Sequence, residues 1–190
     1  IHKLDRYVWN EAAHQVKEWK EKYNVTVPVS VNVSRVDVFN PLLGDMLDGI
    51  IKDSGINHED LLLEITESAY TDNSQQIIDT VTALRDRGFK IEMDDFGSGY
   101  SSLNMLTSLP IDALKLDMKF IRNICVNEKD SALVEIMIRI SDLLEVPIIA
   151  EGVETKEQAE LLKGIGCEII QGYYFSKPVP GEEFEKFIEA

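Results

Sequence analysis

The sequence predicts an α/β fold in which helices connect the strands of a parallel sheet. Short apolar runs alternate along the chain with stretches of helical periodicity. No glycine-rich nucleotide fingerprint follows the first apolar run, which disfavours a doubly wound sheet. Polar residues recur at the ends of successive apolar runs, about one strand and one helix apart: Asn32, Glu64, Asp94, Lys115, Glu151 and Gln171. Such residues meet at one mouth in a barrel, so we expect a modified (β/α)8, TIM-like barrel.

The elements of this barrel are predicted from hydrophobic periodicity. Six apolar runs are expected to be strands: 25–33, 61–67, 90–95, 113–117, 146–151 and 167–172. Helices are expected where apolar residues recur three and four apart: 3–22, 42–51, 77–84, 101–109, 130–144 and 184–188. A further helix is expected to follow the Thr155–Gln158 capping box, and Gly55 and Gly88 mark the ends of two others.

Six predicted strands are two fewer than the eight of a complete barrel. The chain opens directly in a helix with no capping residue before it. We therefore expect the two missing strands to lie upstream of Ile1. Within this sequence, a length of 190 residues predicts one domain over 1–190 with a sizeable core.

Composition excludes several classes of protein. The chain carries 34 acidic and 19 basic residues, a net charge of −15, which argues against binding a nucleic acid polymer. Two cysteines without CxxC spacing predict neither a disulfide framework nor a zinc site. No apolar run approaches the roughly 18–20 residues of a membrane span. We expect a cytoplasmic chain, or the cytosolic part of a larger, membrane-attached protein.

Two adjacent carboxylates, Asp94 and Asp95, end one of the predicted strands. Each opposes ionisation of the other, and a divalent cation is the usual way to compensate such a pair. The alternative is a cap for the turn or helix that follows. Oxygen donors at several strand ends suit two Mg²⁺ or Mn²⁺ ions that activate water: Asn32, Glu64, Asp94, Asp95 and Glu151. Glu64 has the alternative of a buried salt bridge, and Asn32 that of satisfying backbone groups.

Further polar residues are candidates for the same site. Lys115 is a charge in an apolar run and is expected to hold an attacking hydroxide or a phosphate, or to form an ion pair with Asp117 or another interior acid. Glu151 is a metal ligand or the general base for water. Glu67 either begins a helix or anchors the loop after Asp95. Glu154 and Gln171 are weaker candidates. Helix capping also explains Glu154, and only its position favours Gln171.

Six ordered motifs resemble those of the EAL domain family: NVS at 32–34, LEITES at 63–68, DDFGSGYSSL at 94–103, LPIDALKLD at 109–117, AEGVET at 150–155 and QGYYFSKP at 171–178. The resemblance covers essentially the whole chain. It implies a modified β/α barrel that hydrolyses cyclic di-GMP to linear pGpG with Mg²⁺ or Mn²⁺ and is inhibited by Ca²⁺.

The resemblance also implies roles for individual residues. It makes five residues metal ligands: Asn32, Glu64, Asp94, Asp95 and Glu151. Lys115 and Glu151 would activate the water nucleophile, and Glu67 would stabilise the loop that begins at Asp95, through which the family dimerises. Asp95, Glu154 and Gln171 are expected at the substrate.

The sequence departs from the family pattern at three points. The family's Glu-Ala-Leu strand, which supplies a metal-ligating glutamate and is followed by a phosphate-binding arginine, does not appear in this sequence. Ser98 stands where threonine is commoner, and Glu92 is an unusual acid within a strand. The EAL domain over 1–190 is therefore expected to be N-terminally incomplete.

The resemblance and the residues leave three functions open. We expect a cyclic di-GMP phosphodiesterase that acts as a homodimer, with room for an attached sensor or cyclase domain. A module that binds cyclic di-GMP or dimerises without turnover is the first alternative. A Mg²⁺-dependent, enolase-like barrel enzyme is the second, because lysine and carboxylates at strand ends also suit proton abstraction.

Overall fold

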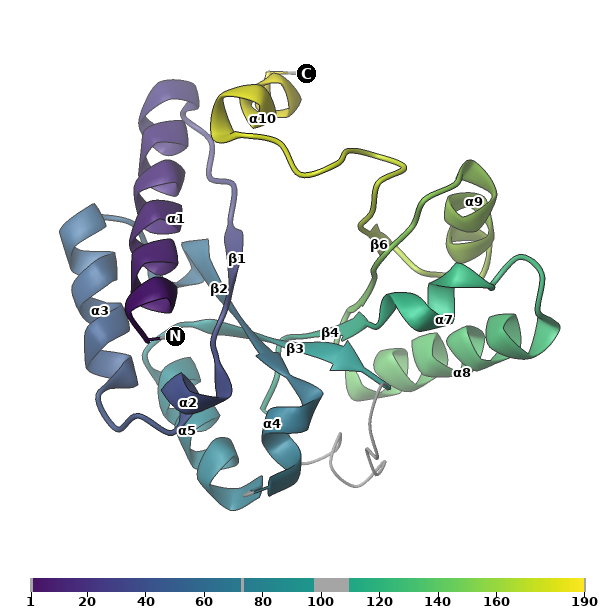
Figure 1. The fold of residues 1–190 in the computed structure, drawn as a ribbon, viewed down its shortest axis with the longest axis horizontal. Coiled ribbons are helices and arrows are strands. Elements are labelled where there is room, and N and C mark those ends of the chain that lie inside the picture. The colour runs from purple at the N-terminus through teal and green to yellow at the C-terminus, as the bar shows by residue number, and fades with distance from the viewer. Residues whose placement is uncertain (1, 73, 98–109, 190) are drawn as a thin grey trace. The chain divides into compact units, whose positions relative to one another are not determined.

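The structure is a computed structural model, and it describes residues 2–72, 74–97 and 110–189 (Figure 1). The chain divides into two compact units. The first comprises residues 1–65, 69–91 and 179–190, and the second comprises residues 66–68 and 92–178.

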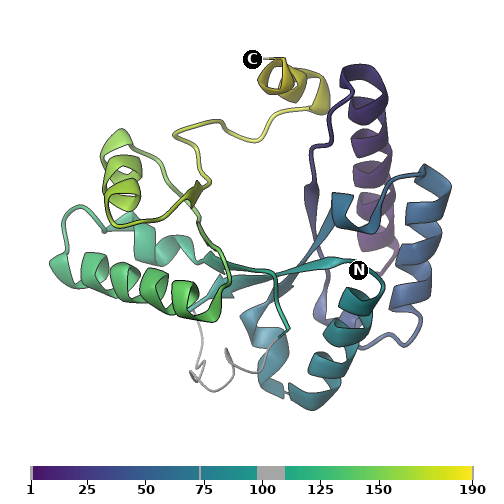
Figure 2. The ribbon, with the colours of Figure 1, turned by 180° about the vertical axis from the view of Figure 1, so that it is seen from behind.

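In the first unit, strand β1 (Val29–Asn32) pairs in parallel with strand β2 (Leu61–Thr66). The last residue of β2, Thr66, is counted in the second unit. Helix α1 (His2–Tyr23) packs next to β1, and helix α3 (Leu43–Ser54) lies side by side with α1 (Figures 1 and 2). Helix α1 buries one stripe of side chains three and four residues apart: Trp9, Ala13, Val16 and Trp19. This stripe follows the 3.6-residue period that predicted the helix.

The first unit also contains the helices α2 (Arg35–Val38), α5 (Ser74–Asp86) and α10 (Gly181–Ile188) and the 3-10 helix η1 (His58–Asp60). Helix α10 packs on α1, where the Trp19 and Phe184 ring centroids lie 5.0 Å apart. Lys22 Nζ lies 2.6 Å from Glu185 Oε2 in the same contact. Helix α10 therefore contacts the apolar stripe of α1 at Trp19.

The second unit contains most of β3 (Lys90–Phe96) and strands β4 (Ala113–Leu116), β5 (Ile148–Ala150) and β6 (Ile169–Ile170). Neighbouring strands pair in parallel throughout this unit. Three helices follow strands β4 and β5: α7 (Met118–Arg122), α8 (Glu128–Leu144) and α9 (Lys156–Gly164). Helices α7 and α8 lie side by side (Figure 2).

The strands follow one another in sequence order, β1-β2-β3-β4-β5-β6, within the part of the chain that the structure describes. A doubly wound sheet reverses its strand order at a switch point, and a β/α barrel does not. The topology therefore confirms the predicted α/β class with barrel-type connections. No helix among the described residues is long and apolar enough to span a bilayer.

Several predicted boundaries are wrong. The strand predicted over 25–33 begins only at Val29, because Pro28 lacks the N–H that a ladder requires. The strands predicted over 146–151 and 167–172 shorten to three and two residues. Periodicity missed three short helices, α2, η1 and α7, because they contain too few residues to show a repeat. Helix α4 (Glu67–Asp72) begins at Glu67, which is one of the two alternatives given for that residue. The helix predicted over 101–109 lies outside the described residues.

Candidate functional site

The end of β3 carries Asp94 and Asp95 in a β-bulge. Met93 pairs with Leu114 and Phe96 pairs with Leu116, so the two aspartates together stand opposite the single residue Lys115. Asp95 has a φ of 55°, in the left-handed region that aspartate tolerates better than most residues. Its backbone N–H donates to Asp94 Oδ1 at 2.8 Å. The bulge therefore brings two consecutive carboxylates to the same strand end.

The charge around Asp95 is unfavourable for its ionised form. Partial desolvation raises its pKa, and the neighbouring Asp94 and Asp117 carboxylates raise it further, against weaker opposing effects of Lys119 and Lys115. The Asp95 side chain is nevertheless exposed to solvent. This site therefore has more negative charge than its lysines neutralise.

Lys115 is the cation of this cluster, and its residue is only 5% exposed. Its Nζ lies 2.6 Å from Glu151 Oε1 and 4.0 Å from Asp94 Oδ1. The ammonium thus lies between carboxylates from the ends of β3 and β5. The alternative of an ion pair between Lys115 and an interior acid is therefore confirmed, with Glu151 and Asp94 as the partners. Asp117 instead caps α7 by accepting from the Lys119 N–H at 2.9 Å, and pairs with Lys119 Nζ at 3.0 Å.

The segment after β5 is fixed by backbone contacts around Glu151. Val153 N–H donates to the Gln171 carbonyl oxygen at 3.1 Å, which joins the segments that follow β5 and β6. Gly172 lies so close that a Cβ there would meet Val153 O at 2.1 Å. These contacts place Gln171 and Glu151 at neighbouring strand ends, as the sequence predicted from their positions.

Glu154 precedes the capping box that opens α9. Thr155 and Gln158 form both hydrogen bonds of that box, as predicted. Gln158 Oε1 also accepts from the Glu154 N–H at 2.8 Å, and its amide nitrogen donates to Ile121 O at 3.1 Å. The side chain of Glu154 is exposed beside the helix N-terminus. Nothing in the sequence indicates that Gln158 is buried and joins α9 to α7.

Glu67 begins α4 and is 1% exposed. Its Oε2 accepts from the Gly97 N–H at 2.7 Å, immediately after β3. Both alternatives for this residue therefore occur together, because the same residue starts a helix and holds the start of the segment after Asp95. Gly97 has a φ of 88°, and a Cβ there would meet the Phe120 ring at 2.6 Å.

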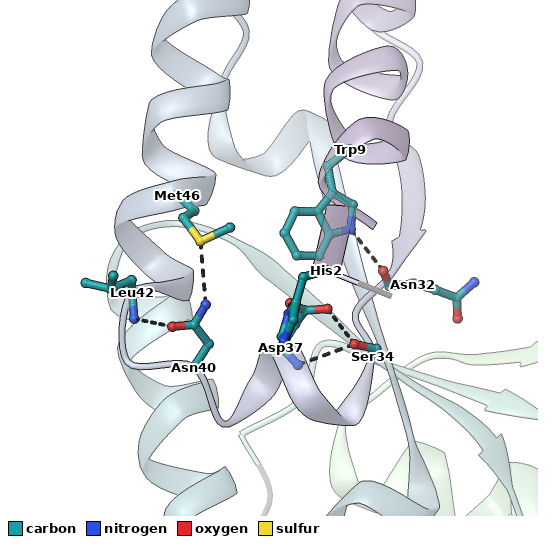
Figure 3. Close-up of polar contacts among 8 residues, drawn as sticks. All are labelled: His2, Trp9, Asn32, Ser34, Asp37, Asn40, Leu42 and Met46. Atoms are coloured by element: carbon teal, nitrogen blue, oxygen red, sulfur yellow. Dashed lines mark hydrogen bonds and ion pairs between the residues drawn. The ribbon is translucent and has the colours of Figure 1, made fainter. Parts of the chain in front are cut away.

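Asn32 and Glu64 both belong to the first unit and pair in register, with Asn32 the last residue of β1 and Glu64 two residues before the end of β2. Side chains at paired positions project from the same face of a sheet. Glu64 is 8% exposed, whereas Asn32 is exposed. Glu92 within β3 is buried at 6% exposure. Trp9, which periodicity assigned only to packing, donates its indole N–H to Asn32 O at 3.0 Å (Figure 3).

The donor chemistry of these residues fits a hard divalent cation. Carboxylate and amide oxygens are the ligands that Mg²⁺ and Mn²⁺ prefer, and the surplus negative charge around Asp95 favours a bound cation. Within the described part of the chain, no three His, Cys, Asp or Glu side chains lie close enough together to form a metal site. Asn32 and Glu64 belong to one unit, and the other candidate ligands belong to the second. The fit of these residues to a divalent cation therefore rests on the type of donor atom and on the local charge.

The fold and these strand ends define a β/α-barrel-type domain with an acidic, lysine-containing cluster at the carboxyl ends of its strands. The sequence pattern of the EAL domain family matches residues 1–178, and the chain belongs to this family. The family membership predicted from the six motifs is therefore confirmed.

Named relatives agree with this assignment. Cyclic di-GMP phosphodiesterase NbdA of Pseudomonas aeruginosa is 35% identical over 190 residues, which cover 100% of this chain and 24% of NbdA. The PaMucR phosphodiesterase in complex with c-di-GMP is 32% identical with a TM-score of 0.92, covering 97% of this chain and 74% of that one. The manganese and cyclic di-GMP complex of Klebsiella pneumoniae BlrP1 at pH 6 is 27% identical with a TM-score of 0.86, covering 94% and 45%. This chain spans about a quarter of the length of the curated relatives it matches.

Proposed function

We propose that this chain is the phosphodiesterase domain of a signalling protein and hydrolyses cyclic di-GMP to pGpG with two Mg²⁺ or Mn²⁺ ions. The observation that carries the proposal is the cluster of Lys115 with Glu151 and Asp94 at the strand ends of an EAL domain. NbdA is named for this activity, and the PaMucR and BlrP1 structures contain the same dinucleotide. Membership of this family leaves the enolase-like alternative without support.

The proposed reaction adds one water to one of the two phosphodiester bonds. A new P–O bond forms to the water oxygen, the bond from phosphorus to the ribose O3′ breaks, and a proton ends on O3′. The product is linear and keeps its second phosphodiester. Divalent ions supply Lewis acidity and a lowered pKa for water. Asn32, Glu64, Asp94, Asp95 and Glu151 would hold these ions.

The protein's own groups have distinct roles in this proposal. Glu151 accepts the proton of the attacking water, and Lys115 keeps that carboxylate oriented, since the two atoms lie 2.6 Å apart. The Lys115 ammonium also neutralises charge that develops on the phosphate oxygens. Glu67 fixes the backbone after Asp95 through Gly97. Three residues are proposed to contact the substrate: Asp95, Glu154 and Gln171.

We also propose that the protein is a homodimer through the segment that follows Asp95, and that it acts in the cytoplasm attached to a sensor or cyclase domain. The curated relatives are about four times as long as this chain, which supports further domains in that class of protein. The oligomeric state measured by light scattering at several concentrations tests the dimer.

Turnover of cyclic di-GMP, followed by chromatography of the nucleotides in Mn²⁺ or Mg²⁺, tests the proposed function. We expect pGpG to accumulate, and Asp94→Asn to reduce its rate at least a hundredfold without loss of folding. Asp53→Asn is the matched control, because Asp53 is an exposed carboxylate on helix α3. Saturable binding of the dinucleotide without pGpG would replace the enzyme by the receptor alternative. Neither binding nor turnover would reject both.

A further inference from the structure

The peptide group that joins Asn32 to Val33 is hydrogen-bonded on both of its sides. Its N–H, from Val33, donates to Glu64 O at 2.9 Å. Its C=O, from Asn32, accepts the indole N–H of Trp9 at 3.0 Å. Two hydrogen bonds therefore connect the Trp9 ring, through the Asn32 peptide, to the backbone of Glu64. Asn32 and Glu64 are the two candidate metal ligands of the first unit.

The geometry of a strand explains why Trp9 is needed. In a trans peptide the C=O and the N–H point in opposite directions, so a peptide whose N–H faces β2 turns its C=O away from β2. Strand β1 stands first in the strand order of the described chain, so no described strand covers that side. An unpaired carbonyl near the core is costly, and the fully buried indole satisfies it.

The strand ends at this same peptide. Asn32 is the last residue of β1, and Ser34 already caps α2, where its Oγ lies 2.5 Å from Asp37 Oδ2 and His2 Nδ1 contacts Asp37 Oδ1. The Val33 N–H bond to Glu64 O is the last contact of this peptide with β2, because the register of the two strands ends at the Asn32–Glu64 pair. Figure 3 shows the Asn32 side chain projecting away from Trp9 and from the Ser34–Asp37 pair. The orientation of that side chain depends on the plane of its own peptide.

We propose that Trp9 is a positioning residue for the metal site, and that its indole N–H sets the direction of the Asn32 side chain. This inference rests on the proposed function, because it needs Asn32 to bind an ion. Loss of the N–H removes one neutral hydrogen bond from a pre-organised ligand. It is therefore expected to weaken Mn²⁺ binding about fivefold.

The same helix offers a matched control in Trp19. Trp19 is also buried on α1, at 6% exposure, and no hydrogen-bond acceptor is within reach of its indole nitrogen among the described residues. Trp9→Phe and Trp19→Phe make the same chemical change in the same helix. Both are expected to lower the thermal stability of the metal-free protein. Only Trp9→Phe is expected to raise the dissociation constant for Mn²⁺.

The experiment measures Mn²⁺ binding to the full-length protein by calorimetry and follows turnover at increasing Mn²⁺. Asn32→Ala identifies the binding event that involves this ligand. Trp9→Phe is expected to shift the Mn²⁺ concentration for half-maximal turnover about fivefold, while kcat at saturating Mn²⁺ stays near that of wild type. Replacing Trp9 by benzothienylalanine, which keeps the ring shape and lacks the N–H, is expected to give the same shift if the phenylalanine variant does not fold.

Several outcomes would overturn the inference. Equal Mn²⁺ affinity for wild type, Trp9→Phe and Trp19→Phe would show that the indole only packs. An equal loss in both tryptophan variants would assign the effect to general destabilisation. In either case wild-type binding and turnover remain, and the proposed function stands. If wild type turns over cyclic di-GMP without any response to Asn32→Ala, the inference fails alone. If wild type neither binds Mn²⁺ nor turns over the dinucleotide, both fail.

Discussion

Removal of the Lys115 charge is expected to destabilise the metal-free protein. Lys115 is buried, and its Nζ lies 2.6 Å from Glu151 and 4.0 Å from Asp94. Breaking a buried ion pair typically costs about 3–5 kcal/mol. The two carboxylate side chains keep 23% and 17% of their exposure, which lets water compensate part of that loss. We therefore expect Lys115→Met to lower the free energy of unfolding by about 2–3 kcal/mol, or Tm by roughly 4–12 °C for a domain of this size.

Thermal unfolding without metal measures this effect, with Lys119→Met as the matched control. Lys119 also forms an ion pair, with Asp117 at 3.0 Å, but its side chain is 74% exposed, so we expect a change within about 0.5 kcal/mol. A double-mutant cycle of Lys115→Met with Glu151→Gln is expected to give a coupling of about 1.5 kcal/mol or more. Equal stability of the two lysine variants, or a coupling near zero, would refute the argument that Lys115 compensates the carboxylates.

Three further predictions concern single residues. Because the pKa of Asp95 is raised in the folded state, ionisation of this residue opposes folding. The contribution of Asp95 to stability is fully present below the unfolded-state pKa of 3.8 and is lost as pH rises through the folded-state pKa. Asp95→Asn should therefore raise the Tm of the metal-free protein at pH 7 but not near pH 3; a gain equal at both values would contradict this. Gly172→Ala should unfold or inactivate the protein, because its Cβ would meet a carbonyl oxygen 2.1 Å away, whereas Gly49→Ala in open space should keep or raise Tm. Glu67→Ala removes a charged acceptor and should cost about 2 kcal/mol and speed hydrogen exchange at the Gly97 amide; unchanged exchange there would exclude the contact.

Long periodic segments were predictable because their periodicity records burial. The stripe that includes Trp9 and Trp19 predicted α1, and the αL glycine Gly55 ends α3 where the sequence placed its stop. Short elements were not predictable. Helix α7 has five residues and begins at the Asp117 cap, and Asp117 pairs with Lys119 although Lys115 is also near it in sequence. Where several possible partners lie near a side chain in sequence, the tertiary structure determines which of them it contacts.

The sequence by itself determined the alternation of strands and helices, the barrel-type class and the presence of polar residues at successive strand ends. These properties depend on local hydrophobic period and on spacing, which are written along the chain. Only the tertiary structure decided that Asp94 and Asp95 both stand opposite Lys115, that this lysine pairs with Glu151, and that a buried indole holds the Asn32 peptide. Each of these contacts joins residues from separate elements. Packing and strand register therefore determine which of these residues contact one another.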